Sequence, residues 1–184
     1  MTTDLTGKTI AFLVAGEGIE QVELTEPWQA VQGAGGTPQL VSPKGGQVQA
    51  FNHLDKGDTF AVDATTDSAD VGAYDALVLP GGVANPDALR LDAGAVAFAK
   101  AFFDAGKPVA AICHAPWTLV EAGVVRGRRM TSWPSLQNDL RNAGAEWVDE
   151  EVIVDTSGAS TLVTSRKPDD LKAFNAALLD AFAG

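Results

Sequence analysis

The feature of this sequence that most restricts its fold is a series of short apolar runs without alternating polar residues. The clearest are TIAFLVA at 9–15, YDALVLP at 74–80 and PVAAIC at 108–113. Strands that are apolar on both faces are typical of a parallel sheet covered by helices on both sides. Amphipathic segments lie between the runs and predict the covering helices. These segments span residues 21–34, 93–106, 115–122, 135–143 and the closing stretch PDDLKAFNAALLDAFA. The pattern predicts an α/β protein with a mostly parallel central sheet.

The chain has 184 residues, which suits one α/β domain over residues 1–184 and is short for two independent domains. Further strands are expected at 38–42 and within EWVDEEVIVD and STLVTS. The polar segment 43–72 is expected to leave the core, with at most a short strand at 60–62.

The charge and the cysteine content limit the classes of partner and the compartment. Thirteen Lys and Arg against 24 Asp and Glu give a net charge of −11, and such a surface repels the phosphates of nucleic acids. A single cysteine forms no internal disulfide, which fits a reducing compartment. The N-terminus lacks the pattern of a signal peptide, and no run approaches the roughly 20 apolar residues of a membrane span. We therefore expect a cytoplasmic protein that binds neither nucleic acid nor membrane.

Polar and glycine residues follow three of the apolar runs directly. These turns are 16–23, 80–87 and 113–116. Functional groups of open parallel sheets gather where strands end at the carboxyl edge. We therefore expect the three turns to converge on one site.

The third turn holds the only cysteine of the chain, Cys113, beside His114. A thiol at a strand-to-helix turn lies near free backbone N–H groups and the positive end of the helix dipole. Both favour the thiolate and lower the thiol pKa from about 8.5. The alternative is a buried structural cysteine, and adjacency alone does not establish a hydrogen bond between the two side chains.

The other two turns offer acids and backbone donors. Glu20 and Glu23 are three residues apart and share a face if the first helical turn includes both. A carboxyl group beside a thiolate has a raised pKa and can donate a hydrogen bond to sulfur, whereas the alternative is that these acids merely suit a helix N-terminus. The N–H groups after Pro80 can hold a developing oxyanion, unless the glycines only form a tight turn. Asp87 is a surface acid or supports the site from outside it.

Metal and cofactor chemistry find little support in the sequence. One cysteine and two widely separated histidines do not make a metal site. No phosphate-binding Walker A pattern occurs, and AGEGIE lacks the spacing of a dinucleotide fingerprint. His53, in a polar loop, is predicted to be a surface residue. We expect neither a cofactor nor a metal.

The three turns, taken together and in this order, resemble the ThiJ/PfpI family of the class I glutamine-amidotransferase-like superfamily. The likeness runs over nearly the whole chain and is strongest in GIEQVEL, YDALVLPGG and GKPVAAICHAPWTLVEAGVVRGRRMTS. It implies a flavodoxin-like three-layer sandwich and a homodimer or higher homo-oligomer. It also implies that Cys113 is a nucleophile at a strained turn, with Glu23 against its sulfur and Glu20 in the same pocket.

The resemblance assigns the remaining site residues as well. The backbone N–H groups of Gly82 and His114 match the family's oxyanion donors. His114 also matches the histidine that PfpI-like members pair with an acid from the adjacent subunit, and that acid falls on Asp87. Asp87 is shorter than the Glu of PfpI-like proteins, and Trp133 replaces a Tyr of close relatives, so no hydroxyl acts there. No histidine follows His114, which argues against glutaminase activity.

The resemblance implies a stress-response, cysteine-dependent hydrolase that acts through Cys113 on reactive carbonyls or glycated adducts, or on peptides. Two other functions fit the same residues. One is a redox-sensing protein in which Cys113 is reversibly oxidised. The other is a chaperone-like or scaffolding dimer without catalysis.

Overall fold

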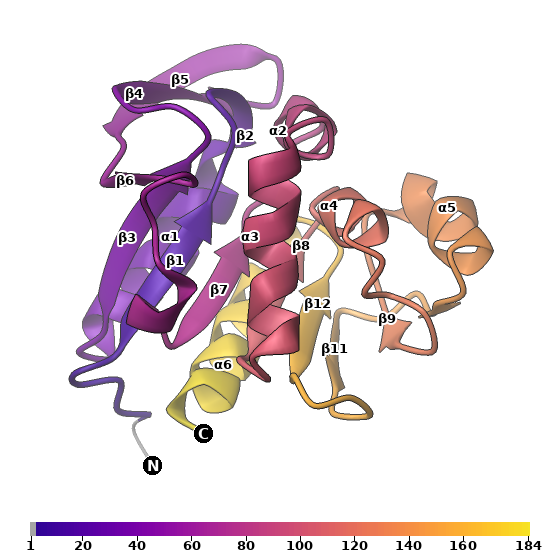
Figure 1. Ribbon diagram of the computed structural model, residues 1–184. Helices are drawn as coiled ribbons and strands as arrows, with labels where there is room; N and C mark the ends of the chain where they lie inside the picture. The colour runs from indigo at the N-terminus through magenta and orange to yellow at the C-terminus, as the bar shows by residue number, and fades with distance from the viewer. Residues whose placement is uncertain (1–2) are drawn as a thin grey trace.

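The computed structural model describes residues 3–184 and confirms the predicted α/β fold (Figure 1). A seven-stranded sheet forms its centre, with all neighbouring strands parallel except at one edge, where β11 runs antiparallel to β12. In spatial order its strands are β11 (Val152–Asp155), β12 (Leu162–Ser165), β8 (Val109–Ile112), β7 (Ala76–Leu79), β1 (Thr9–Leu13), β3 (Thr37–Ser42) and β6 (Ala64–Thr65). The sandwich is the flavodoxin-like one expected from the sequence.

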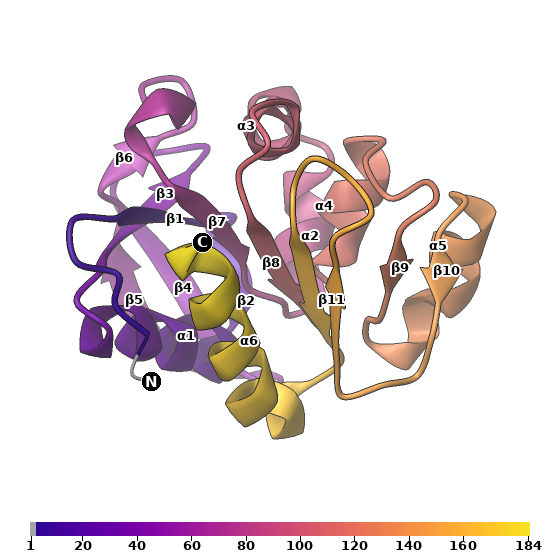
Figure 2. The same cartoon turned by 90° about the horizontal axis from the view of Figure 1, so that it is seen from below.

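Helices cover both faces of this sheet and make the two outer layers (Figure 2). The helices are α1 (Gln21–Gly33), α2 (Ala84–Leu89), α3 (Ala93–Asp104), α4 (Pro116–Glu121), α5 (Gln137–Asn142) and α6 (Leu171–Ala183), with 3-10 turns at Val71–Ala73, Pro134–Leu136 and Pro168–Asp170. One core cluster lies under α1 and α6, and the other lies under α3, α4 and α5. The four residues of β7 and of β8 are all buried, which explains why these runs carry no polar alternation.

The central strands β1, β7 and β8 lie side by side in parallel register. Their carboxyl ends therefore meet at one edge of the sheet, and the three turns that follow them converge there. This arrangement confirms the prediction that the three turns converge at one edge of the sheet.

The segment 43–72 is more ordered than the sequence analysis predicted. It forms an antiparallel hairpin of β4 (Gln47–Asn52) and β5 (Asp55–Ala61), and β4 pairs with β2 (Glu17–Glu20) in a second sheet. Val48 and Ala50 of β4 are buried in the α1-side core, so part of the segment belongs to the core. The prediction was wrong because β4 carries only three apolar residues, Val48, Ala50 and Phe51, within a polar segment, and only Val48 and Ala50 are buried.

Several smaller elements also differ from the prediction. The turn after β1 contains the short strand β2, and a separate short helix, α2, follows the Pro-Gly-Gly turn. EWVDEEVIVD contains two strands, because β10 (Glu146–Trp147) pairs with β9 (Arg129–Met130) while β11 joins the main sheet. Within residues 3–184, every helix is too short or too polar to cross a bilayer.

Candidate active site

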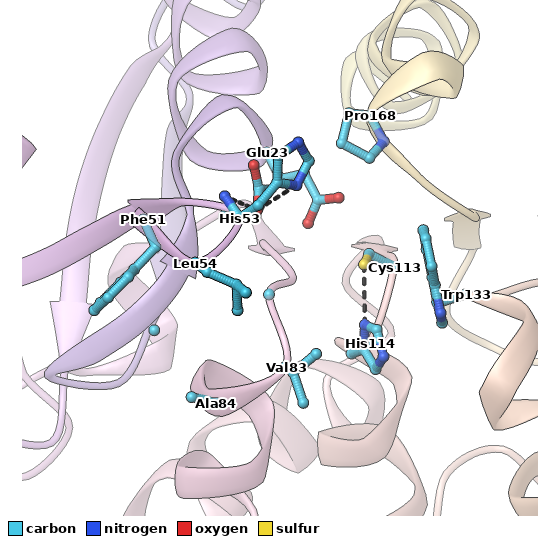
Figure 3. Close-up of a pocket in the computed structure, with 13 residues that line it drawn as sticks. Glu23, Phe51, His53, Leu54, Val83, Ala84, Cys113, His114, Trp133 and Pro168 are labelled. Carbon is cyan, nitrogen blue, oxygen red and sulfur yellow. Dashed lines mark hydrogen bonds and ion pairs between the residues drawn. The ribbon is translucent and has the colours of Figure 1, made fainter. Parts of the chain in front are cut away.

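Cys113 lies in the sharp turn between β8 and α4, with a backbone φ of 63°. This left-handed conformation is unfavourable for a residue with a side chain and persists where the surroundings hold it. Cys113 N donates to Ser165 O at 3.0 Å, and Trp133 N donates to Cys113 O at 2.9 Å. These two hydrogen bonds hold the turn and keep the sulfur at the pocket (Figure 3).

The ring of His114 contacts the sulfur and packs against two indoles. Its Nδ1 lies 3.1 Å from Cys113 Sγ, within hydrogen-bond distance. The ring stacks on that of Trp133, with 5.6 Å between the ring centroids and 22° between the planes, and the Trp117 ring is tilted against it with a centroid distance of 5.3 Å. Burial lowers the pKa of His114 to about 4, so the ring is neutral at pH 7 and Nδ1 can accept the thiol hydrogen. The sequence left open whether the neighbouring side chains of Cys113 and His114 form a hydrogen bond, and in the structure they lie within hydrogen-bond distance.

Glu23 is fully buried in the first turn of α1. Its pKa is raised to about 8 by burial and then by the charge of Glu20, while the nearby Cys113 thiol and the N–H groups of Gly81 and Gly82 offset part of this. Within residues 3–184, neither carboxyl oxygen has a hydrogen-bond partner of good geometry. Glu23 is therefore mostly protonated at neutral pH and holds a proton next to the sulfur.

The pKa of the Cys113 thiol is raised, which is opposite to the direction predicted from the sequence. Burial is the main cause and the charge of Glu23 the second, whereas the N–H groups of Gly82 and His114 lower the pKa. The prediction took the backbone N–H groups of the turn into account but not the burial of Cys113, which is only 6% exposed. At neutral pH the resting sulfur is therefore a thiol with a hydrogen-bond acceptor beside it.

The Pro-Gly-Gly turn after β7 requires both of its glycines. A Cβ on Gly81 would collide with the Glu23 carboxyl group and lie 2.6 Å from Cys113 Cβ. Gly82 has a φ of 84°, and a Cβ there would collide with the carbonyl oxygen of Gly18. Only glycine allows this close approach of backbone and side chains.

Asn85 is a site residue that the sequence analysis missed. Its side chain is fully buried, and Oδ1 accepts a hydrogen bond from Ala15 N at 2.7 Å. Nδ2 donates to Pro80 O at 2.9 Å and to Gly81 O at 3.0 Å. Asn85 thus ties the end of β1 to the glycine turn. A polar residue soon after a strand-ending Pro-Gly-Gly turn was the available signal.

Glu20 and Asp87 occupy different positions relative to the pocket. Glu20 immediately precedes α1 rather than lying in its first turn, and its Oε2 accepts from His53 N at 3.1 Å and lies 3.7 Å from His53 Nδ1. The His53 side chain is 85% exposed, as predicted, yet it lines the pocket mouth. Asp87 is exposed on α2 and does not line the pocket.

The side chains of Cys113, His114 and Glu23 all line one cavity of about 410 Å³. It is lined by Gly18, Glu20, Glu23, Phe51, His53, Leu54, Gly82, Val83, Ala84, Cys113, His114, Trp133 and Pro168. Across residues 3–184, no three His, Cys, Asp or Glu side chains gather in a way that could hold a metal ion. The arrangement provides a nucleophilic sulfur, a neutral imidazole, a protonated carboxyl group and backbone donors in one pocket.

Known proteins resemble this chain over nearly its whole length. The model of the DJ-1/PfpI family matches residues 8–181. A deglycase from Pyrococcus horikoshii is 43% identical over 90% of this chain and 93% of its own length. General stress protein 18 of Bacillus subtilis is 41% identical over 92% of this chain and 94% of its own length. The crystal structure of Drosophila melanogaster DJ-1beta superposes with a TM-score of 0.83 at 26% identity, covering 96% of this chain and 91% of that one.

Proposed function

Because the chain belongs to the DJ-1/PfpI family, we propose that it is a stress-response, cysteine-dependent enzyme. Its substrates are small reactive carbonyl compounds or their adducts, and Cys113 is the nucleophile. The relatives named a deglycase and a general stress protein support this assignment. The observation that carries it is the meeting of Cys113 Sγ, the neutral His114 ring and the protonated Glu23 carboxyl group in one pocket.

The first step forms a bond between sulfur and the aldehyde carbon of a 2-oxoaldehyde. The thiol proton passes to His114 Nδ1, which lies 3.1 Å away. The electron pair of the C=O bond moves onto the oxygen, near the N–H groups of Gly82 and His114, and the oxygen takes the proton of Glu23. The product is a hemithioacetal, and Glu23 is left as a carboxylate.

The second step moves a hydrogen and releases the product. The Glu23 carboxylate removes the proton from the carbon bonded to sulfur, and the imidazolium protonates the neighbouring carbonyl oxygen to give an enediol. Glu23 then protonates the neighbouring carbon, and loss of a hydroxyl proton to His114 gives a thioester of a 2-hydroxy acid. Water adds to the thioester carbon and the C–S bond breaks; the sulfur takes the proton of the imidazolium, and the proton that the water loses returns to Glu23, which restores the thiol, the neutral ring and the carboxyl group. One water is consumed in the whole reaction, and no oxidant or reductant is needed.

The test is turnover of methylglyoxal by the purified protein, with the 2-hydroxy acid product quantified. Cys113→Ala should abolish turnover, since removal of a catalytic nucleophile costs several orders of magnitude in rate. Circular dichroism and the melting temperature of the variant serve as folding controls. Absence of turnover by wild-type protein whose thiol is intact by mass would reject the proposal.

We also propose that the protein is a single-domain, cytoplasmic homodimer or larger homo-oligomer. In this assembly Asp87 of one subunit approaches His114 of the next. The support is that Asp87 is exposed and lies outside its own chain's pocket. Mixing inactive Cys113→Ala subunits with impaired Asp87→Ala subunits should restore part of the activity. Purely additive activities in the mixture would contradict an acid supplied across subunits.

A redox-sensing role for Cys113 has weaker support. A protonated Glu23 could donate to an oxidised sulfur. However, the residue is only 6% exposed and its thiol pKa is raised, whereas redox-sensing cysteines are accessible and have low pKa values. Carbonyl chemistry is therefore the function that the geometry favours.

A further inference from the structure

We infer that the pocket selects 2-oxoaldehydes whose substituent is neutral and apolar, such as an aryl group, and rejects those that carry a carboxylate or a phosphate. This inference rests on the proposed function and names its substrate class. It follows from what surrounds the sulfur rather than from the sulfur itself.

Apolar side chains form most of the pocket wall away from the reacting groups. Phe51 and Leu54, near the β4–β5 turn, lie across the opening from Cys113, and Val83 lies below it in the view of Figure 3. Leu54 is 94% exposed and Val83 is 56% exposed. Trp133, on the cysteine side, is 38% exposed. A substituent placed between these side chains covers apolar surface that otherwise faces water, which favours an apolar group.

The charge of the pocket acts against an anion. Two acidic residues line it, Glu20 and the mostly protonated Glu23, whereas none of the lining residues is Lys or Arg. The charge of Glu20 acts at the base of the pocket, since it raises the pKa of Glu23. A carboxylate on the substrate would lose water and meet this charge without a cation to pair with.

His53 does not change this balance. Two histidines line the pocket, His53 and the buried His114, and the ring of His53 is largely in solvent beside Glu20, 3.7 Å from the carboxylate. The His53 ring therefore lies where it contacts Glu20, and the lining offers no Lys or Arg to pair with a substrate anion. The net charge of −11 adds repulsion at longer range.

Three substrates test the inference in wild-type protein: methylglyoxal, phenylglyoxal and 4-carboxyphenylglyoxal. The last two share the aryl ring and the reacting group and differ by one carboxylate. We expect kcat/KM for phenylglyoxal to exceed that for 4-carboxyphenylglyoxal by at least about tenfold, the scale on which pocket contacts discriminate substrates. Equal values for the two would overturn the inference.

A matched pair of variants separates the pocket from the net charge. Leu54→Lys places a cation at the pocket mouth. Leu91→Lys adds the same charge at a leucine that is 85% exposed and does not line the pocket. Leu54→Lys should shift the preference toward 4-carboxyphenylglyoxal by about tenfold, and Leu91→Lys should leave the ratio near that of the wild type. The same shift in both variants would overturn the role of the pocket wall.

Turnover of methylglyoxal distinguishes a wrong substrate class from a wrong proposed function. If methylglyoxal is turned over and the two aryl substrates react equally well, the substrate class is wrong and the proposed function stands. If none of the three is turned over by protein with an intact thiol, the proposed function fails and the inference fails with it.

Discussion

At the scale of single residues, the proposed reaction depends on two acidic groups that share one buried space. The pKa of Glu23 is raised to about 8 and that of the Cys113 thiol is raised as well. Because each charge disfavours the other in a dry environment, the pair is most stable with at least one proton. That proton is what the proposed reaction uses, first at the substrate oxygen and then at the neighbouring carbon.

The raised pKa of Glu23 predicts how stability depends on pH. The carboxyl group titrates near its ordinary 4.5 when unfolded and at about 8 when folded. The stability that protonation gives to the folded state is therefore present at low pH and lost as the pH rises through about 8. Between about pH 7 and pH 9, the unfolding free energy of wild-type protein should fall relative to that of Glu23→Gln, measured by denaturant titration.

The range for this measurement lies above the titration of His114. The pKa of His114 is lowered to about 4 from 6.5, so its contribution to stability is lost as the pH falls from 6.5 toward 4, below the range used. Parallel stability curves for the two proteins would show that the folded pKa of Glu23 is not raised.

At the scale of elements, the three turns are held to one another by a few backbone contacts. Asn85 links Ala15, just after β1, to the carbonyl oxygens of Pro80 and Gly81. These hydrogen bonds fix the peptide groups that precede Gly82, whose N–H is the proposed oxyanion donor. Asn85 thus acts through the turn and is a positioning residue.

Asn85→Asp tests this role with an isosteric side chain. One carboxylate oxygen can still accept from Ala15 N, while the other faces two carbonyl oxygens instead of donating to them. We expect a loss of about 1–3 kcal/mol in stability. We also expect a fall in kcat for methylglyoxal with little change in KM, because the donor acts on the transition state. An unchanged kcat in a folded variant would contradict the assignment.

The sequence predicted the elements whose apolar pattern is strong and missed those held by backbone contacts. Runs such as YDALVLP and PVAAIC were enough to predict β7, β8 and the edge where their turns meet. The hairpin of β4 and β5 was missed because only Val48 and Ala50 of β4 are buried and the surrounding residues are mostly polar. The roles of Gly81 and Asn85 depend on segments distant in the sequence, which no local pattern reports. The net direction of the Cys113 pKa shift was mispredicted because burial depends on the whole fold.

At the scale of the whole molecule, the charge and the pocket act in the same direction. The chain carries a net charge of −11, and Glu20 lines the same pocket as Cys113 and raises the pKa of Glu23. Charged reagents of the same sign are therefore repelled both at a distance and inside the pocket.

The negative charge of the molecule predicts a difference in alkylation rate between two thiol reagents of similar size. Neutral iodoacetamide should alkylate Cys113 faster, relative to free cysteine, than anionic iodoacetate does. The long-range part of the difference should shrink as salt is added, because salt screens exposed charges over about 10 Å at 0.1 M. The two alkylation rates are measured by following the intact mass of the protein at two salt concentrations. A ratio equal to that of free cysteine at both concentrations would contradict the predicted repulsion.

If Glu23 controls the reactivity of Cys113, the pH dependence of Cys113 alkylation must change when its carboxyl group is removed. The rate with iodoacetamide is followed by intact mass in wild-type protein and in Glu23→Gln. We expect a lower titration midpoint in Glu23→Gln, because an ionised carboxylate beside the sulfur no longer raises the thiol pKa. Superimposable profiles for the two proteins would contradict it.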